Sequence, residues 1–433
     1  MKRLWLAILA ALVSWTSIMS AHEVPDRVQV GVFLKPEQRR MLMLVRMPAN
    51  ALIDFLLPTL QGGNWLDLAN ADAVAAEGAR VWIADMLSIY ENAAALPKPQ
   101  LLAVRLSRTN DPSFATFQDA LNRVNGAPLP ADTLVLQEEV TVDALLEAPI
   151  TSMHSRFSFE PRFARLGVIV DTSLTFLTSS GDIRQFQYQD DPETFLLDPG
   201  LGYSVARFVR AGIAHYFSET DYLLITLCVV LVFQPIRGLL PFALALVAAE
   251  SLALLGSLEL GYTQPGIRGL VGVLIAATTV YTGIEAIIAG DGKRVGLAIV
   301  AGLIVGCGFA LGMQPMLQFG GAHALASGLG FTLGIVITEL GTLMLLLVAV
   351  QAVLKLSRVP RMTIIVASAV AIHISWRTML ERADALALVP LGVLVATPAL
   401  VAAICAGMLS ILAMSAWVRR WQQHEGRSRQ APH

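Results

Sequence analysis

Several ionisable side chains lie inside long apolar stretches in the second half of this 433-residue chain. Glu250 falls in LVAAESLALL, Glu339 in GIVITELGTL and His373 in VAIHISWRTML. A charge at the middle of a bilayer costs at least about 2.5–3.5 kcal/mol, so residues of this kind are candidates for function. The other candidates are Glu285 in VYTGIEAIIAG, Cys307 in GLIVGCGFALG, and His215, Glu219 and Asp221 just before the first apolar stretch.

These side chains are of types that bind cations. Carboxylates, imidazoles and thiolates are ligands of divalent transition metals, and carboxylates and imidazoles also form proton relays. The order of the loops predicts that Glu250, Cys307, Glu339 and His373 lie at similar depth, which favours a shared site. The alternative is that these groups pair with each other or with Ser and Thr hydroxyls and fix helix packing. For Cys307 the alternative is that its side chain packs in the interior as a small apolar group and binds no ion.

Seven apolar stretches follow residue 204, each close to the ~20 residues that cross the hydrocarbon core of a bilayer. They lack period-two alternation, and backbone polar groups cannot stay unpaired in lipid, so helices are predicted. The chain is 55% hydrophobic and only 15% charged, against about 25% charged residues in soluble domains. The stretches are Tyr222–Pro235, Leu239–Leu258, Ile267–Ala289, Val295–Met313, Leu325–Leu354, Met362–Leu380 and Leu386–Val418.

The distribution of basic residues predicts the orientation of these helices. Lys2 and Arg3, an apolar segment and Ser20-Ala21 together indicate a signal peptide over residues 1–21. Loops on the cytoplasmic side would hold ten basic residues and loops on the outer side three, which is the positive-inside asymmetry. We therefore predict an exported domain over 22–204, a helical bundle over 205–421 and a cytoplasmic tail over 422–433. The ten are Arg237, Lys293, Arg294, Lys355, Arg358, Arg361, Arg419, Arg420, Arg427 and Arg429, and the three are Arg268, Arg377 and Arg382.

The exported domain is predicted to be α+β with a β-sandwich-like core. Two extended apolar runs, 28–34 and 39–47, flank a proline-containing turn and predict a hairpin. Residues 66–125 have a more helical pattern, and strand patterns return over 156–189, where Ser180 to Asp182 supply a turn. The domain holds no cysteine, nucleophile elbow, phosphate loop or His/Cys cluster. We therefore expect it to bind a partner or act in gating rather than in catalysis.

Two further patterns bear on helix packing. Residues 205–221 (VARFVRAGIAHYFSETD) have apolar residues at helical spacing, which suits a helix lying at the outer membrane interface. Small residues at small-xxx-small spacing let two helices approach closely, and the alternative is a thinned or broken helix that lines a polar cavity. The glycines concerned are Gly302, Gly306, Gly308 and Gly312, followed by Gly328, Gly330 and Gly334.

Over residues 208–382 the chain resembles the HupE/UreJ family of bacterial membrane proteins, which are linked to nickel or cobalt uptake for hydrogenase and urease. The resemblance rests on HYFSETDY (His215, Asp221), AESLAL (Glu250), YTGIEA (Tyr281, Glu285), GLIVGCGFA (Gly306, Gly308, Phe309), ELG (Glu339) and WRTMLER (Trp376 to Arg382). The exported domain, which opens with AHEVP, is also similar to that of longer family members. Together with the intramembrane residues, the resemblance implies a permease of the bacterial inner membrane. Its expected metal ligands are His215, Asp221, Glu250, Glu339 and His373, with Glu219, Tyr222, Glu285 and Cys307 along the transport pathway.

Three histidines of the family pattern are replaced in this chain, by Tyr222, Glu250 and Val305. His215 and residue 222 are i and i+7, which places them on one face of a continuous helix. The chain thus offers an imidazole and a phenol where the family offers two imidazoles, and Val305 cannot bind an ion. Glu250 is a harder oxygen ligand, which favours Mn, Mg or Co-like ions, or protons.

Two functions agree with these residues. The first is a divalent-metal permease driven by an ion gradient or potential, because GDGKR at 290–294 lacks the upstream glycine and the following Ser or Thr of a nucleotide loop. The alternative is a non-transporting scaffold or accessory protein whose exported domain binds a periplasmic protein. An enzyme is disfavoured, since no HExxH pair or Ser/Lys dyad with helical spacing occurs, and we predict no catalytic residue and no resident cofactor. The net charge of −2 gives no electrostatic basis for binding nucleic acid.

Overall fold

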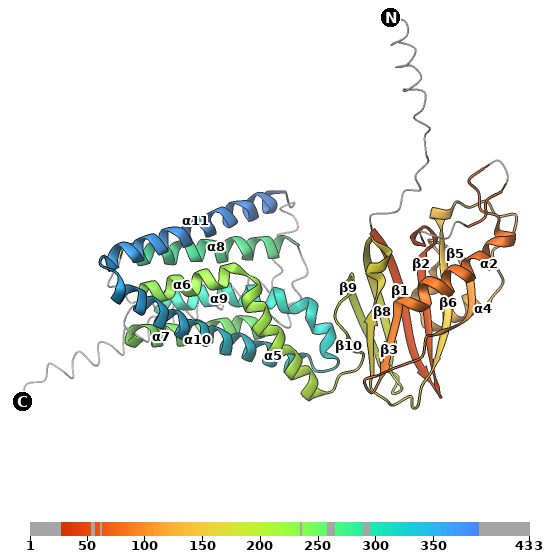
Figure 1. Cartoon of the computed structure of the whole chain (residues 1–433), viewed down its shortest axis with the longest axis horizontal. Helices are drawn as coiled ribbons and strands as arrows, with labels where there is room; N and C mark the ends of the chain where they lie inside the picture. The colour runs from red at the N-terminus through yellow and green to blue at the C-terminus, as the bar shows by residue number, and fades with distance from the viewer. Residues whose placement is uncertain are drawn as a thin grey trace, which may run out of the picture. The chain divides into compact units, whose positions relative to one another are not determined.

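The computed structural model describes residues 27–52, 57–60, 63–233, 236–257, 265–288 and 295–388. The chain divides into two compact units between Asp198 and Pro199, a few residues before the boundary that we placed after residue 204 (Figure 1). The predicted signal peptide and nearly all of the seventh apolar stretch lie outside the described residues.

The first unit is built on a six-stranded sheet in the order β5-β6-β2-β1-β8-β9. Strands β1 (Arg27–Glu37) and β2 (Arg40–Pro48) form the predicted antiparallel hairpin. The turn is made by Gln38 and Arg39, because Pro36 still pairs with Met41 in the ladder and Gln38 adopts the left-handed φ of 55°. The other strands are β5 (Gln100–Arg108), β6 (Val140–Pro149), β8 (Ile169–Leu177) and β9 (Ile183–Gln189).

A second, four-stranded sheet has the order β10-β7-β3-β4. Its strands are β10 (Phe195–Leu196), β7 (Phe157–Pro161), β3 (Leu87–Glu91) and β4 (Ala94–Ala95). The two sheets meet through aromatic side chains: the ring of Phe186 in β9 lies 5.0 Å from that of Phe195, and the ring of Phe176 in β8 lies 6.4 Å from that of Phe157. The unit therefore has two layers of sheet with an aromatic core between them.

The helical prediction for residues 66–125 was correct at both ends and wrong in the middle. Helix α2 (Leu68–Gly78) continues through a π-helical turn (Ala79–Ile83) into α3 (Ala84–Met86), and α4 spans Phe117–Asn125. Strands β3, β4 and β5 lie between them. In β3 the burial alternates over only five residues, and so short a strand gives little periodicity to detect. Short 3₁₀ turns cover Ala49–Ala51, Pro112–Ala115, Gln137–Glu139 and Phe163–Leu166.

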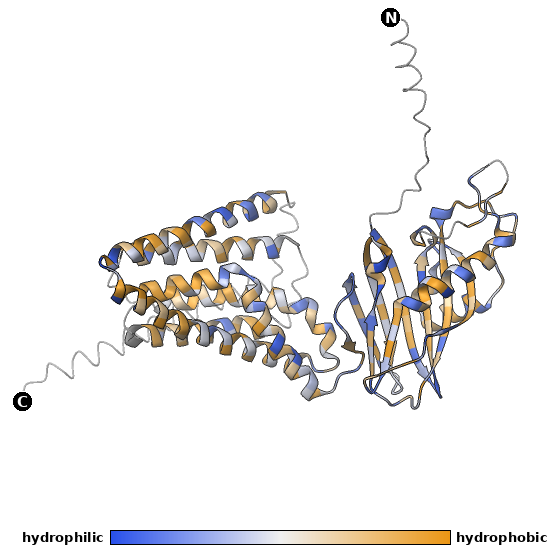
Figure 2. Cartoon of the chain, viewed as in Figure 1, coloured by the Kyte–Doolittle hydropathy of each residue, from blue (hydrophilic) through white to orange (hydrophobic). Residues whose placement is uncertain are grey.

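The second unit is a bundle of helices made largely of hydrophobic residues (Figure 2). Its helices are α5 (Leu201–Ser218), α6 (Thr220–Val232), α7 (Ile236–Gly256), α8 (Pro265–Ile288), α9 (Val295–Met313), α10 (Ala324–Leu356) and α11 (Pro360–Ala387), with a 3₁₀ segment at Gln314–Gly320. Five stretches, in α7 to α11, are long and apolar enough to cross a membrane, and α5 with α6 forms a sixth if the pair, bent by 75°, is one span. The described residues thus hold five or six of the seven spans that we predicted.

Glycines set the contacts between the helices, and α9 and α10 are continuous through them. A Cβ at Gly306 of α9 would lie 2.8 Å from the Cβ of Ala253 in α7, and a Cβ at Gly330 of α10 would lie 2.8 Å from the carbonyl oxygen of Val205 in α5. These separations are well inside van der Waals contact, so only glycine lets the backbones approach. The close-packing interpretation of the glycine pattern is confirmed, and the broken-helix alternative does not apply to α9 and α10.

The same contacts give the directions of the helices. Gly302 of α9 packs on Leu246 and Ala249 of α7 while Gly306 packs further along α7, so these two helices run parallel. Gly272 of α8 lies against Arg382 of α11 while Gly283 lies against Ile372, so these two run antiparallel. Alternating directions of this kind are what successive spans joined by short loops require.

Helix α5, which we predicted to lie at the outer membrane interface, packs one face against α10. Its buried residues, Ser204, Phe208, Gly212 and Tyr216, form one face, and Gly212 lies against the backbone of Phe331 in α10. The glycines of α10 allow this close approach, and the remaining residues of α5 are exposed or half-buried. Sequence periodicity detects that one face of a helix is apolar but cannot tell lipid from a neighbouring helix.

Candidate functional site

The most deeply buried acidic groups of the bundle are paired. Glu250 of α7 is 4% exposed and Glu339 of α10 is 3% exposed, and their carboxyl groups share a hydrogen bond. An ionised carboxylate only accepts hydrogen bonds, so the bond requires a proton on at least one of the two. The Oε2 atom of each is buried and has no partner within the described residues. The pair therefore leaves two oxygen atoms free to bind a cation.

Hydroxyl groups from the neighbouring helices surround this pair. The Tyr216 hydroxyl of α5 lies 2.6 Å from the Thr226 hydroxyl of α6 and also hydrogen-bonds with Thr342 of α10. Tyr216 is close enough to both glutamates for their charges to act on it. Four helices, α5, α6, α7 and α10, thus contribute polar groups to one region inside the bundle. Sequence analysis missed Tyr216, Thr226 and Thr342, for which the available signal was a hydroxyl within an apolar helix.

His215 lies in an aromatic cage nearby. Its ring centroid is 5.8 Å from that of Tyr222, 6.1 Å from that of Phe309 and 5.7 Å from that of Phe331. The backbone of Gly312 touches the imidazole so closely that any Cβ there would overlap it. The Nε2 atom is buried and has no partner within the described residues. His215 therefore presents a nitrogen inside the bundle that is open to a ligand or a water molecule.

His215 and Tyr222 are in contact, but the prediction that they share a face of one helix was wrong. We expected a continuous helix with the two residues on one face. The chain instead breaks at Glu219, and α5 and α6 are bent by 75°. The bend, and not the i, i+7 spacing, brings the two rings together.

Asp221 is held by an arginine. The Arg382 Nη1 atom of α11 lies 2.5 Å from the Asp221 Oδ2 atom, and the carboxylate of Glu219 is 3.9 Å from the same guanidinium. Arg382 Nη1 also donates a 3.0 Å hydrogen bond to the carbonyl oxygen of Gly272 in α8. In the sequence, Arg382 counted as a charge that sets topology and as the end of the WRTMLER motif. Its pairing with Asp221 shows no sequence signal, because the two residues belong to helices far apart in the chain.

The remaining candidates occupy separate places. His373 is exposed on α11, and Cys307 is half-buried on α9. Glu285 is half-buried on α8 and accepts a 3.1 Å hydrogen bond from the Tyr281 hydroxyl of the same helix. Among the described residues, no three His, Cys, Asp or Glu side chains come close enough together to hold a metal ion. The five ligands that we predicted are therefore split there into a carboxyl pair, a caged histidine, a neutralised aspartate and an exposed histidine.

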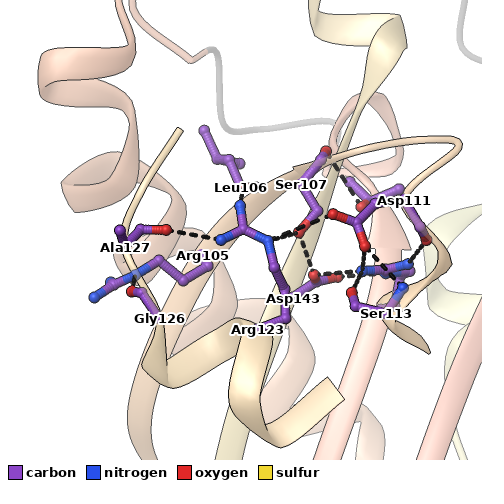
Figure 3. Close-up of polar contacts among 11 residues, drawn as sticks. Arg105, Leu106, Ser107, Asp111, Ser113, Arg123, Gly126, Ala127 and Asp143 are labelled. Carbon is purple, nitrogen blue, oxygen red and sulfur yellow. Dashed lines mark hydrogen bonds and ion pairs between the residues drawn. The ribbon is translucent and has the colours of Figure 1, made fainter. Parts of the chain in front are cut away.

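The first unit contains a polar network of a different kind (Figure 3). Asp143 is fully buried, and Arg46 binds both of its oxygen atoms, from Nε at 2.6 Å and from Nη2 at 2.7 Å. The Ser107 hydroxyl also donates to Asp143, and Arg123 donates to Ser107. Burial raises the pKa of nearby Asp111, but hydrogen bonds from Ser113 and the charges of Arg46 and Arg123 outweigh it, so that the pKa lies below its usual value. Every charge in this network is matched, which indicates a structural role.

A family comparison covers the bundle. Residues 192–382 match the family described as HupE / UreJ protein, which confirms the resemblance drawn from the motifs. The match includes α5 to α10 and most of α11, but only the last few residues of the first unit. No curated protein and no solved structure matches the chain.

Proposed function

We propose that the bundle, which belongs to the HupE/UreJ family over residues 192–382, moves a divalent transition-metal ion across the membrane and binds it at the carboxyl pair of Glu250 and Glu339. Family membership suggests a membrane protein related to nickel or cobalt transport. The observation that supports metal binding at this place is the pair itself. It is buried between α7 and α10 and has one unpartnered oxygen on each side chain among the described residues.

Charge balance supports a cation at this place. Two ionised carboxylates side by side in a medium of low dielectric repel each other strongly, and a divalent cation between them neutralises both. The free oxygens and the hydroxyl groups around Tyr216 make an all-oxygen environment, which suits Mn- or Co-like ions better than softer metals. Glu250, which stands where the family pattern has histidine, supplies one half of the pair.

Most of the other predicted residues fit a route to this pair. His215 and Tyr222 face each other in the interior, and Glu219 and Asp221 lie at the junction of α5 and α6. Glu285 and Cys307, which are half-buried on α8 and α9, stay in the proposal as pathway residues, whereas His373, which we predicted as a ligand, is exposed on α11 and is not part of this route. The ion would move down a gradient or potential, because the sequence encodes no nucleotide site.

The membrane assignment is part of the same proposal. The basic residues favour an inner-membrane protein whose first unit is periplasmic and whose C-terminus is cytoplasmic. The alternating helix directions agree with this threading. The predicted signal peptide supports export of the first unit, where a protein partner would meet it.

The test is metal binding to the detergent-purified full-length protein, by elemental analysis and by titration with Ni²⁺, Co²⁺, Mn²⁺ and Zn²⁺. Stoichiometric binding that is lost in Glu250→Gln and in Glu339→Gln is expected. The matched control is Glu381→Gln, which makes the same change at an exposed carboxylate paired with Arg377. Binding that survives both substitutions in the pair would contradict the proposal.

The alternative is a membrane-anchored accessory protein that does not transport. The observation in its favour is that the predicted ligands do not form a cluster of three within the described residues. The same titration distinguishes a metal permease from an accessory protein, since the accessory protein is expected to bind none of the four ions.

A further inference from the structure

The side chain of Arg382 connects three helices and ends on one carboxylate. It starts from α11, passes Gly272 of α8, donates to the carbonyl oxygen there and ends on Asp221 of α6. A Cβ at position 272 would come within 3.0 Å of the Arg382 side chain. The glycine thus leaves the space through which the guanidinium reaches the aspartate.

The exposures of the three charged side chains are graded. The side chain of Asp221 is 8% exposed, that of Arg382 is 30% exposed and that of Glu219 is 49% exposed. Asp221 is therefore covered, and the guanidinium that holds it is closer to the surface of the bundle. Glu219, only 3.9 Å from the same guanidinium, offers a second carboxylate in a more exposed position.

We propose that Arg382 is a tethered cation that occupies the place of the transported ion at Asp221, and that an entering divalent ion must displace it towards Glu219. This inference rests on the proposed cation transport and adds a residue that sets its selectivity. A guanidinium is a permanent single positive charge in protein conditions. A monovalent ion gains no more from Asp221 than the guanidinium already provides, whereas a divalent ion attracts the carboxylate about twice as strongly at equal distance.

The second arginine near this region fits the same arrangement. Arg268 of α8 donates to the carbonyl oxygen of Leu311 in α9 and is close enough to His215 for its charge to act on the imidazole. Asp221 and His215, the two predicted ligands nearest the α5–α6 junction, thus each have a guanidinium close by. An ion that passes them must overcome fixed positive charge, which again disfavours weakly bound monovalent cations.

The experiment uses the full chain reconstituted in liposomes that contain a fluorescent chelator, with Co²⁺ as the probe and K⁺ as the competitor. Arg382→Gln removes the tethered charge, and Arg377→Gln is the matched control on the same helix, where the arginine is exposed and paired with Glu381. Arg382→Gln is expected to lower the Co²⁺ concentration for half-maximal uptake about tenfold and to make uptake sensitive to K⁺. Arg377→Gln is expected to change neither. The double variant Asp221→Asn with Arg382→Gln should lose the increased apparent affinity for Co²⁺ that Arg382→Gln alone shows.

Four results decide between the possibilities. If Arg382→Gln is folded and has wild-type Co²⁺ affinity and no sensitivity to K⁺, the pair only holds helices together and the inference is wrong. If Arg382→Gln does not fold, Arg382→Lys is tested instead: it keeps the positive charge, so wild-type Co²⁺ affinity and insensitivity to K⁺ are expected, and uptake that becomes sensitive to K⁺ in the folded Lys variant overturns the inference. If the wild-type protein takes up no Co²⁺ and binds none at Glu250 and Glu339, the proposed function fails and the inference fails with it. Uptake that depends on Glu339 but not on Arg382 overturns the inference alone.

Discussion

The contact between Gly306 and Glu250 gives the sharpest test of how the carboxyl pair is positioned. A Cβ at Gly306 would lie 2.8 Å from both the Cα of Glu250 and the Cβ of Ala253 and would overlap the Glu250 carbonyl oxygen. None of these atoms moves by a change of rotamer, so Gly306→Ala must push α9 away from α7. The shift would act directly on the backbone that carries Glu250.

The expected change in the stability of Gly306→Ala follows from two opposing effects. Replacing glycine by alanine inside a helix stabilises it by up to about 1 kcal/mol, while overpacking a filled interface costs about 1–3 kcal/mol. Gly296 supplies the control, because a Cβ there meets nothing within 4 Å among the described residues and it lies on the same helix. We therefore expect Gly306→Ala to be less stable than Gly296→Ala by about 1–3 kcal/mol.

The assay is the thermal unfolding of the full-length protein in detergent, followed by a Co²⁺ titration of each variant at a temperature where both are folded. Gly306→Ala should unfold at a lower temperature than Gly296→Ala and bind Co²⁺ more weakly, whereas Gly296→Ala should be at least as stable as the wild type and bind Co²⁺ equally well. Equal stability and equal binding in the two variants would refute the close-packed arrangement of α7 and α9 at Glu250.

The other predictions concern charged groups. Arg382→Gln alone should destabilise the bundle by about 3–5 kcal/mol because it leaves Asp221 buried and unpaired, and the double variant with Asp221→Asn should recover most of that loss in a denaturation series. Arg46→Met should cost the first unit a similar amount, about 3–5 kcal/mol, since Asp143 then loses its bidentate partner; Arg40→Met, at an exposed ion pair, should cost under about 1 kcal/mol in the same assay. Burial raises the pKa of Glu91, but hydrogen bonds from Thr151, Ser152 and Ser155 in the loop after β6 outweigh it and lower the pKa to about 2 from 4.5. Because the folded pKa lies below the unfolded value, this stabilisation is full above pH 4.5 and is lost as the pH falls towards 2. Glu91→Gln should flatten the pH dependence of unfolding within that window, and an unchanged slope would show that Glu91 contributes nothing to it.

Local patterns of the sequence predicted the parts of the structure that depend on neighbouring residues. Apolar stretches near twenty residues long predicted the helices of the second unit, and the glycine spacing predicted the tight contacts of α9 and α10. The hairpin of β1 and β2 and the turn at Gly181, which has a φ of 93°, also followed from short segments. These features are set by side-chain polarity and backbone freedom within one element, so a single sequence carries them.

Pairings between distant elements were decided only by the tertiary structure. Glu250 and Glu339 were both candidates, but their hydrogen bond depends on which faces of α7 and α10 meet. Apolar residues surround each helix on all sides, because lipid and protein interior both accept them, and so the sequence does not mark the inward face. For the same reason, the sequence did not indicate that Arg382 pairs with Asp221. It also did not show that His373, a polar residue in an apolar stretch, is exposed on α11. The sequence therefore determined that this chain is a membrane bundle with costly polar groups, and the packing of the helices determined which of those groups meet.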